Sequence, residues 1–252
     1  MKPIQQLSCI GTLLLFTTIF SGPLLAEDQT PLYGELLRQH VKEGQVDYSG
    51  LKKKEAQLDT YLEYLAATDP AQMAEEERFA FYINVYNAYT IKLILENFQD
   101  GQPPESIKDI GSFFSKPWAI KFVTVGGKTH SLDNIEHDIL RPTFKDPRVH
   151  FAVNCASKSC PPLIAAPYAG EKLDQQLEAN TRTFINNQRE NRLEGDTLYA
   201  SAIFKWFKED FQNDPVAFFE QYAEGDLKKE LTAQKGRIKV RYLDYDWSLN
   251  GN

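Results

Sequence analysis

Hydrophobic positions along this chain fall mostly at helical spacing. The segment 74–97 is the strongest example, because three acidic residues open it and apolar residues then follow almost all the way round. A helix that is apolar on every side is expected to be buried, so its polar side chains need hydrogen-bond partners. The same spacing predicts further helices at 31–41, 51–67, 133–140, 170–187, 201–211, 215–222 and 226–233.

Short alternating or glycine-punctuated segments predict a small amount of strand. Hairpins are expected at 120–132 and 193–199, each around a turn that contains glycine, and a last strand at 236–245. The segment 148–154 alternates cleanly between apolar and polar residues, which predicts a further strand. The expected fold class is therefore α+β, a mainly helical single domain with a small antiparallel sheet.

The N-terminus has the pattern of a secretory signal peptide. Lys2 is followed by an apolar run from residue 7 to residue 20 and then by Ala26, a small residue suited to cleavage. We therefore expect residues 1–26 to be removed and the protein to lie in the periplasm or to be secreted. An uncleaved anchor is the alternative, because Leu24 is a weak residue three positions before the cut.

Composition and charge narrow the class of partner. Removal of residues 1–26 leaves 27 basic and 35 acidic residues, a net charge of −8, and we expect no nucleic-acid partner because that needs clustered positive charge. After signal removal, no second apolar run is long enough to span a bilayer. The remaining 226 residues suit one domain, 27–252, of which 27–70 is a helical N-terminal part.

The segment 148–160, with the sequence RVHFAVNCASKSC, contains the most chemistry. It holds a histidine and both cysteines that remain after signal removal, Cys155 and Cys160. An even number of cysteines in an oxidising compartment favours a disulfide, and four intervening residues can close such a loop. The favoured interpretation is thus a structural Cys155–Cys160 disulfide, with a stabilisation of about 2 kcal/mol.

A thiol nucleophile is the main alternative. A cysteine becomes a thiolate near neutral pH beside a histidine or at a helix N-terminus. On an extended strand, His150 would lie roughly 16 Å from Cys155 and on the opposite face, so His137 or His130 is the better candidate base. No histidine follows Cys160, which excludes the Cys-before-His order of ordinary papain-like enzymes. If there is a site, Cys155, His137 and His150 should come together.

Redox and metal chemistry are weaker interpretations of the same cysteines. The spacing is not Cys-x-x-Cys and no βαβ unit surrounds it, which argues against a thioredoxin-like pair. Two thiolates with His137 or His150 could form a zinc set, yet the spacing matches no zinc pattern. We therefore predict no metal and no cofactor.

Three other polar residues are candidates for binding. Asn84 and Asn87 share one face of the apolar helix, and burying either side chain unpaired would cost about 1–3 kcal/mol. They either anchor another backbone segment or line a pocket. Arg141 could hold a carboxylate of a ligand, although a salt bridge to an acid of the chain is the simpler expectation.

Four landmarks resemble the domain-of-unknown-function family 547 (DUF547), which we take as an uncharacterised family of exported bacterial proteins. They are FYINVYNAY at 81–89, SLDNIEH at 131–137 with Ile139-Leu-Arg141, the stretch 150–162, and YDWSLN at 245–250. They occur in family order across nearly the whole chain after residue 26. The resemblance implies no settled reaction and no catalytic roles. It implies that these polar landmarks share one site.

Two functional classes follow from the sequence, and it does not decide whether the protein is an enzyme. The first is an exported binding or scaffold domain with a disulfide-pinned loop, whose partner is an unknown small molecule or peptide. The second is a thiol hydrolase or transferase acting on a small amide or peptide, with a permuted His-before-Cys order. A free thiol of lowered pKa beside an imidazole, and a cleft that can hold a substrate, would favour the enzyme.

Overall fold

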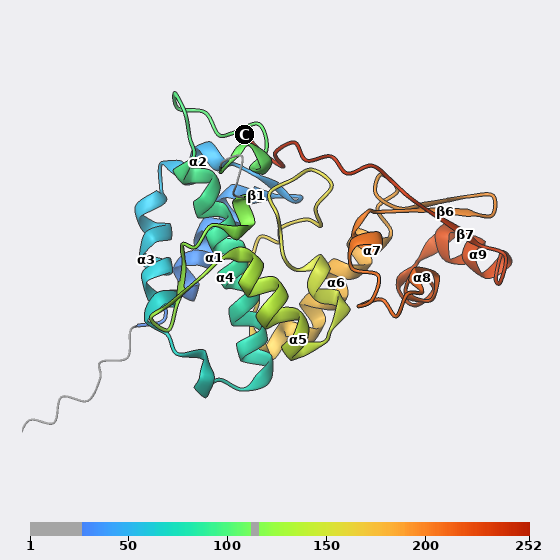
Figure 1. The fold of residues 1–252 in the computed structure, drawn as a ribbon, viewed down its shortest axis with the longest axis horizontal. Helices are drawn as coiled ribbons and strands as arrows, with labels where there is room; N and C mark the ends of the chain where they lie inside the picture. Colours follow the sequence, from blue (N-terminus) through green and yellow to red (C-terminus); the bar gives the residue numbers. More distant parts are fainter. Residues whose placement is uncertain (1–26, 112–115) are drawn as a thin grey trace, which may run out of the picture.

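The computed structural model describes residues 27–111 and 116–252 (Figure 1). The predicted signal peptide lies outside these residues. The long helix α4, Glu75–Glu96, is packed on several sides by other elements and is buried along most of its length. The elements that precede it are α1 (Thr30–His40), β1 (Val41–Lys42), β2 (Gln45–Val46), α2 (Tyr48–Lys52), α3 (Glu55–Ala67) and the short 3₁₀ helix η1 (Pro70–Gln72).

The elements after α4 build the walls of the site and a C-terminal lobe. The first group is η2 (Ile107–Asp109), η3 (Pro117–Ala119), the hairpin β3 (Val123–Val125) and β4 (Lys128–His130), η4 (Asn134–Leu140), α5 (Arg141–Phe144) and η5 (Pro147–Phe151). The second group is η6 (Gly170–Lys172), α6 (Leu173–Ile185), β5 (Arg192–Glu194), β6 (Thr197–Ala200), α7 (Ile203–Trp206), α8 (Pro215–Tyr222), α9 (Gly225–Ala233) and β7 (Lys239–Tyr242).

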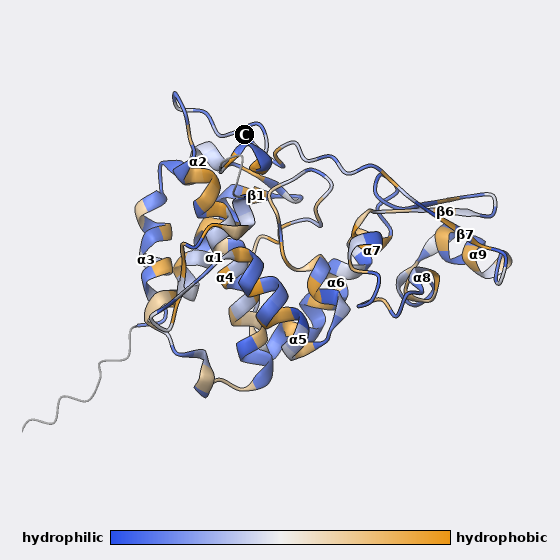
Figure 2. Ribbon diagram, viewed as in Figure 1, coloured by the Kyte–Doolittle hydropathy of each residue, from blue (hydrophilic) through white to orange (hydrophobic). Residues whose placement is uncertain are grey.

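Two buried clusters form the core. The larger one surrounds α4 and takes in α1 to α3, and α3 shows both hydrophobic and polar stretches along its length (Figure 2). The smaller cluster is rich in phenylalanine and packs α6 against the elements that follow it, from β5 to β7, which form the C-terminal lobe. The segment η5 connects the two, because Val149 belongs to the first cluster and Phe151 to the second. Residues next to η5 therefore lie where the two cores meet.

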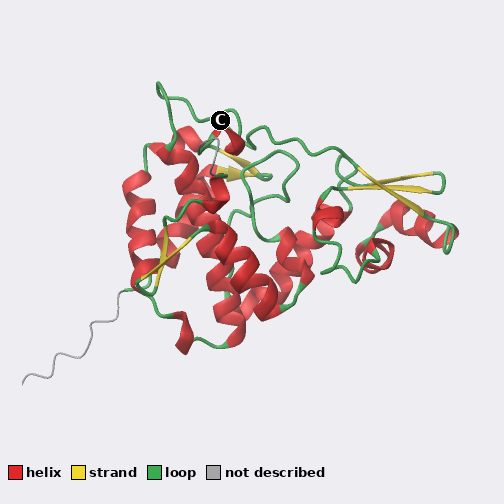
Figure 3. Ribbon diagram, in the orientation of Figure 1, coloured by secondary structure: helices red, strands yellow, loops and turns green. Residues whose placement is uncertain are grey.

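The predicted fold class is confirmed, since helices dominate and the strands are few and short (Figure 3). Both predicted hairpins are present, as β3–β4 and β5–β6. The last strand, β7, pairs with β6 in parallel rather than antiparallel register. Within the two described ranges, no helix combines the length and the apolar character that crossing a membrane requires.

The prediction of a strand at 148–154 is wrong. The chain forms the 3₁₀ helix η5 there, with Pro147 in its first turn and the Asp146 side chain accepting a hydrogen bond from the Arg148 N–H. A proline after an aspartate cap is a helix-start signal that outweighs the alternation. The predicted helix at 201–211 is also too long, because α7 ends at Trp206.

Candidate functional site

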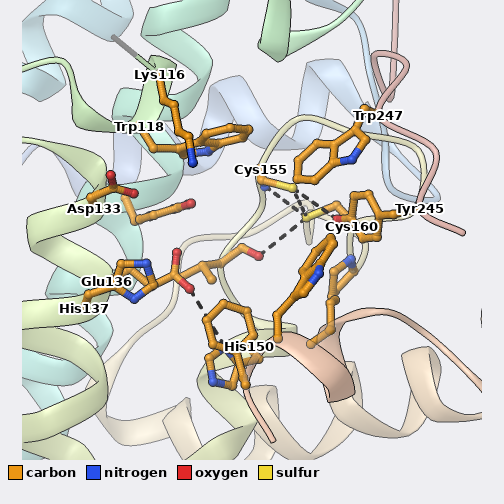
Figure 4. Close-up of a pocket in the computed structure, with 16 residues that line it drawn as sticks. Lys116, Trp118, Asp133, Glu136, His137, His150, Cys155, Cys160, Tyr245 and Trp247 are labelled. Atoms are coloured by element: carbon orange, nitrogen blue, oxygen red, sulfur yellow. Dashed lines mark hydrogen bonds and ion pairs between the residues drawn. The ribbon is translucent and has the colours of Figure 1, made fainter. Parts of the chain in front are cut away.

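A cavity of about 410 Å³ lies beside η5. Its lining comes from segments far apart in the sequence: α4, η3, η4, η5, the loop that contains both cysteines, α7 and the segment after β7. Figure 4 shows Asp133, Glu136 and His137 on one side of it and the two cysteines with Tyr245 and Trp247 on the other. We call these sides the acidic wall and the sulfur wall.

The cysteine loop, residues 154–162, begins at a buried amide anchor. Asn87 of α4 donates from Nδ2 to the Ala152 carbonyl at 2.9 Å and accepts at Oδ1 from the Asn154 N–H at 2.8 Å. Asn154 then closes the loop, because its Nδ2 donates to the Pro161 carbonyl at 2.8 Å and its Oδ1 accepts from the Ala156 N–H at 3.0 Å. These buried bonds hold the backbone on both sides of Cys155.

The C-terminal segment, residues 245–250, runs along the cysteine loop. The Lys158 N–H donates to the Ser248 carbonyl at 2.8 Å, and the Asn250 N–H donates to the Ala156 carbonyl at 3.1 Å. This pairing brings Tyr245 and Trp247 into the cavity lining. The family resemblance implied that this segment shares a site with the cysteine loop, and both line the cavity.

The Cys155 sulfur has three hydrogen-bonding neighbours. Its Sγ lies 3.0 Å from Ser157 Oγ, 3.1 Å from Cys160 Sγ and 3.2 Å from Tyr245 Oη. The hydrogen bond with Cys160 is the main cause that lowers the pKa of Cys155, and those with Ser157 and Tyr245 add to it against the opposing effect of burial. Cys155 is thus the thiol of this pair that more readily becomes a thiolate.

The pKa of Cys160 is shifted in the opposite direction, although its sulfur accepts a hydrogen bond from the Cys155 N–H at 2.9 Å. Burial raises the pKa of Cys160, and its hydrogen bond with Cys155 raises that pKa further. The Sγ–Sγ distance of 3.1 Å exceeds the about 2.05 Å of a disulfide bond, and both cysteines are free thiols. The predicted disulfide is therefore absent from this structure, and its formation in an oxidising compartment stays a prediction.

The acidic wall is built on η4, a π-helix. The Arg141 N–H, at its C-terminal end, donates to the Glu136 carbonyl five residues earlier, which is the π-helical pattern. Ser131 and Asn134 cap its start reciprocally: each side-chain oxygen accepts from the other residue's N–H at 3.1 Å. Wide turns of this type often occur at functional sites. This turn places Glu136 and His137 next to each other in the cavity lining.

Glu136 is the buried acid of the cavity, with a relative exposure of 9%. Burial raises the pKa of Glu136, although the nearby His137 and the Tyr86 hydroxyl act in the opposite direction. Its nearest cationic or potentially cationic group is His150, whose Nδ1 lies 3.9 Å from Oε1. The carboxyl group therefore keeps its proton to a higher pH than an exposed glutamate does.

His150 lies at the base of the acidic wall with a relative exposure of 3%. Its Nε2 lies 2.6 Å from Asp210 Oδ2, and its ring stacks on Phe207 with 3.9 Å between centroids. Burial lowers the pKa of His150, whereas His150 and Arg141 together hold the pKa of Asp210 well below its usual range. The lowered pKa of His150 favours a neutral imidazole, and the lowered pKa of Asp210 favours a carboxylate. The imidazole then donates from Nε2 to Asp210, which leaves Nδ1 as an acceptor facing Glu136.

The candidate residues meet only in part. Cys155, His137 and His150 line one cavity, as expected for a shared site, and their catalytic roles stay predictions. In the part of the chain that the structure describes, no histidine nitrogen is hydrogen-bonded to either sulfur. His137 is exposed and accepts at Nδ1 from Arg141 at 3.1 Å instead. The separation of about 16 Å inferred for His150 and Cys155 assumed a strand, which η5 replaces.

The three binding candidates have structural partners. Asn84 donates to the Tyr168 carbonyl and accepts from the Tyr168 N–H, both at 2.8 Å. Asn87 anchors the cysteine loop, and Arg141 forms a two-pronged ion pair with Asp210 at 2.6 and 3.1 Å. None of the three lines the cavity. A role in ligand binding stays a prediction for each, and their observed partners are those of anchors.

The cavity also contains every tryptophan of the chain. The sequence has 3 tryptophans, and Trp118, Trp206 and Trp247 all lie in the lining. Trp247 is 5.4 Å from Trp118, 5.6 Å from Trp206 and 4.5 Å from Tyr245 between ring centroids. These aromatic residues, together with Glu136 and Asp210, were not predicted as site residues from the sequence. Its only signals were the family landmarks at 131–137 and 245–250.

Comparisons with known proteins add a family but no reaction. Among residues 27–111 and 116–252, no group of three or more His, Cys, Asp or Glu side chains is placed to hold a metal ion. Neither the curated proteins nor the solved structures contain a match to the chain. Residues 70–185 match the family described as "Protein of unknown function, DUF547". This match supports DUF547 as the family of the segment that holds the cysteine loop, η4 and η5.

Proposed function

We propose that the chain is an exported thiol hydrolase or transferase that acts on a small amide or peptide, with Cys155 as the nucleophile. One observation supports this most strongly: the Cys155 sulfur borders a cavity and has three hydrogen-bonding groups within 3.2 Å. A thiolate stabilised by such neighbours is a nucleophile near neutral pH without a histidine in direct contact. Export rests on the signal-peptide pattern of residues 1–26.

The reaction would proceed through a thioester. The Cys155 thiolate attacks the substrate carbonyl carbon, a carbon–sulfur bond forms, and the carbon–nitrogen bond breaks. The leaving amine takes a proton, and water or an acceptor amine then attacks the thioester and restores the thiolate. Water as acceptor makes the protein a hydrolase, and an amine makes it a transferase.

The acidic wall supplies a proton donor for the leaving amine. Burial raises the pKa of Glu136, so its carboxyl group carries a proton at a higher pH than an exposed glutamate does. The neutral His150, oriented by Asp210, has its Nδ1 3.9 Å from Glu136 and can pass a proton on. His137 lines the same wall and is the second candidate for proton transfer. All these groups precede Cys155 in the sequence except Asp210.

Trapping of the thioester tests the proposal. The protein is mixed with small p-nitrophenyl esters and peptidyl p-nitroanilides, and the acylated residue is identified by mass spectrometry. We expect an acyl adduct on Cys155 that is absent from Cys155→Ala and still forms in Cys160→Ser. An adduct on another residue only, or p-nitrophenol release that Cys155→Ala leaves unchanged, would reject thiol catalysis.

An exported binding domain with a Cys155–Cys160 disulfide is the second candidate function. The observation that favours it is the Sγ–Sγ distance of 3.1 Å, because a shift of about 1 Å would bring the sulfurs to bonding distance. Periplasmic protein alkylated before cell lysis distinguishes the two candidates. Two modified cysteines favour the enzyme, whereas modification that requires prior reduction favours the binding domain.

A further inference from the structure

The aromatic part of the cavity combines rings that pack against the core, Trp118 and Trp247, with the exposed ring of Trp206. Trp206 is 46% exposed, the highest value for a large hydrophobic side chain among the described residues. Trp247 contacts both Trp206 and Trp118, so three indole rings meet at the cavity. Exposed aromatic rings that converge on a cavity are typical of ligand binding rather than of packing.

These rings are able to attract positive charge. Lys108 places its Nζ 5.0 Å from the centre of the Trp247 ring, and Arg141 lies 4.9 Å from the centre of the Phe207 ring. The ring quadrupole is negative over each face, and indole is the strongest of the aromatic side chains in this respect. Two aromatic rings of the lining, Trp247 and Phe207, thus already contact cations of the protein itself.

Glu136 provides the second, independent observation. It is about nine-tenths buried, lines the cavity, and no lysine or arginine forms an ion pair with it in the described parts of the chain. His150 Nδ1 lies 3.9 Å from the Glu136 carboxyl group, and burial lowers the pKa of His150. His137 and Arg141 lower the pKa of Glu136 through their charge without forming an ion pair with it in the described parts of the chain. A buried carboxyl group that faces a cavity without a cationic partner is suited to a cation supplied by a ligand.

We propose that this cavity selects ligands that carry a cationic nitrogen, which lies between the tryptophan faces and the Glu136 carboxyl group. Ammonium, guanidinium and quaternary ammonium groups share this chemistry. Lys116 is the one lysine or arginine of the lining, and it is exposed whereas Glu136 is buried. Asp133, half-buried in the same wall, adds a second carboxyl group. The interior of the cavity therefore favours a positive ligand over a negative one.

The inference rests on the proposed thiol chemistry only where it calls this ligand a substrate. In that case, the acyl group transferred to Cys155 or the amine that leaves it bears the positive charge. Binding of the cation itself requires neither cysteine. Cation binding and acylation of Cys155 are therefore separate measurements, and one can fail while the other succeeds.

Choline and its neutral carbon isostere 3,3-dimethyl-1-butanol are the matched probes. Since all 3 tryptophans line the cavity, tryptophan emission excited selectively over tyrosine reports on this site. We expect choline to change the emission with a dissociation constant about tenfold lower than that of the isostere, as cation–π and carboxylate contacts of this kind suggest. Acetate, the anionic probe, should bind no better than the isostere.

Two glutamate variants sharpen the test. Glu136→Gln should remove the preference for choline. Glu190→Gln should leave it intact, because Glu190 is also a partly buried acid whose pKa burial raises, but it contacts Ser159 and lies outside the lining. Equal affinity for choline and the isostere in the unaltered protein, a response to neither, or an unchanged preference in Glu136→Gln would overturn the proposal. The comparison of the two probes needs no variant to fold.

Discussion

The two walls of the cavity shift proton affinities in opposite directions. On the sulfur wall, hydrogen-bonding groups from the loop itself and from the C-terminal segment surround Cys155 and lower its pKa. On the acidic wall, Glu136 is buried on a π-helix, and this burial raises its pKa. Environments that separate two titratable groups in this way are how one site holds both a nucleophile and an acid.

The two walls also differ in the kind of interaction that fixes them in place. Asn87 anchors the sulfur wall to α4 through two backbone hydrogen bonds. The acidic wall depends on the ion pairs and stacking of side chains, with Asp210 joining Arg141 to His150. The sulfur wall should therefore respond to loss of its buried amide, and the acidic wall to changes of charge and pH.

The largest expected effect is on the sulfur wall. Asn87→Ala leaves the Ala152 carbonyl and the Asn154 N–H without their partner, and we expect a loss of about 2–4 kcal/mol in the free energy of unfolding. Chemical denaturation measures this loss. The altered loop should also make Cys155 react more slowly with iodoacetamide at neutral pH, because its neighbours no longer converge on the sulfur.

Asn84→Ala is the matched control for that comparison. Asn84 lies one turn earlier on α4 and makes the same two kinds of bond, but to the backbone of Tyr168. We expect a similar loss of stability with no change in the alkylation rate of Cys155. Equal slowing in both variants would mean that reactivity follows global stability and not the anchoring of the cysteine loop.

A smaller effect is expected from pH on the acidic wall. Because the pKa of Glu136 is raised in the folded protein, its contribution to stability is present below the unfolded value of about 4.3 and is lost as pH rises through the folded value. Each unit of the shift corresponds to about 1.4 kcal/mol. Glu136→Gln should therefore become more stable relative to the unaltered protein as pH rises through this range.

Asp210 should show the opposite sign. Its pKa is held low by hydrogen bonds from His150 and Arg141, so its contribution to stability is present above its unfolded value and is lost as pH falls through the folded one. Asp210→Asn should lose more stability at neutral pH than in acid. Unfolding curves at several pH values compare the two variants, and slopes of the same sign would contradict the assignment of the two carboxyl groups.

Sequence periodicity predicted the elements that depend on residues close together in the chain. The α4 helix and the two hairpins follow from apolar spacing and glycine turns. The segment 148–154 was misassigned because it lies between two cores and is buried on both sides, with Val149 in one and Phe151 in the other. Burial on both sides makes an alternating pattern a poor indicator of strand.

The site itself depended on contacts between distant residues. Cys155 was identifiable because cysteines are few, whereas its neighbour Tyr245 is 90 residues away. The pairing of His150 with Asp210 spans 60 residues. A single sequence carries no signal for such pairs, so Glu136, Asp210 and the tryptophans emerged only from the fold. The family resemblance at 131–137 and 245–250 indicated that these segments belong to the site, but it did not indicate the chemical roles of their residues.

The central claim is that Cys155 is a thiol of lowered pKa, and its alkylation rate as a function of pH tests this most directly. Mass spectrometry follows iodoacetamide modification of Cys155 in the reduced protein, in Cys160→Ala and in Cys160→Ser. We expect an apparent pKa below the usual value of about 8.5, a rise toward that value in Cys160→Ala, and a smaller rise in Cys160→Ser, whose hydroxyl can still donate. An apparent pKa at or above the usual value in the unaltered protein, unchanged by either substitution, would contradict the account.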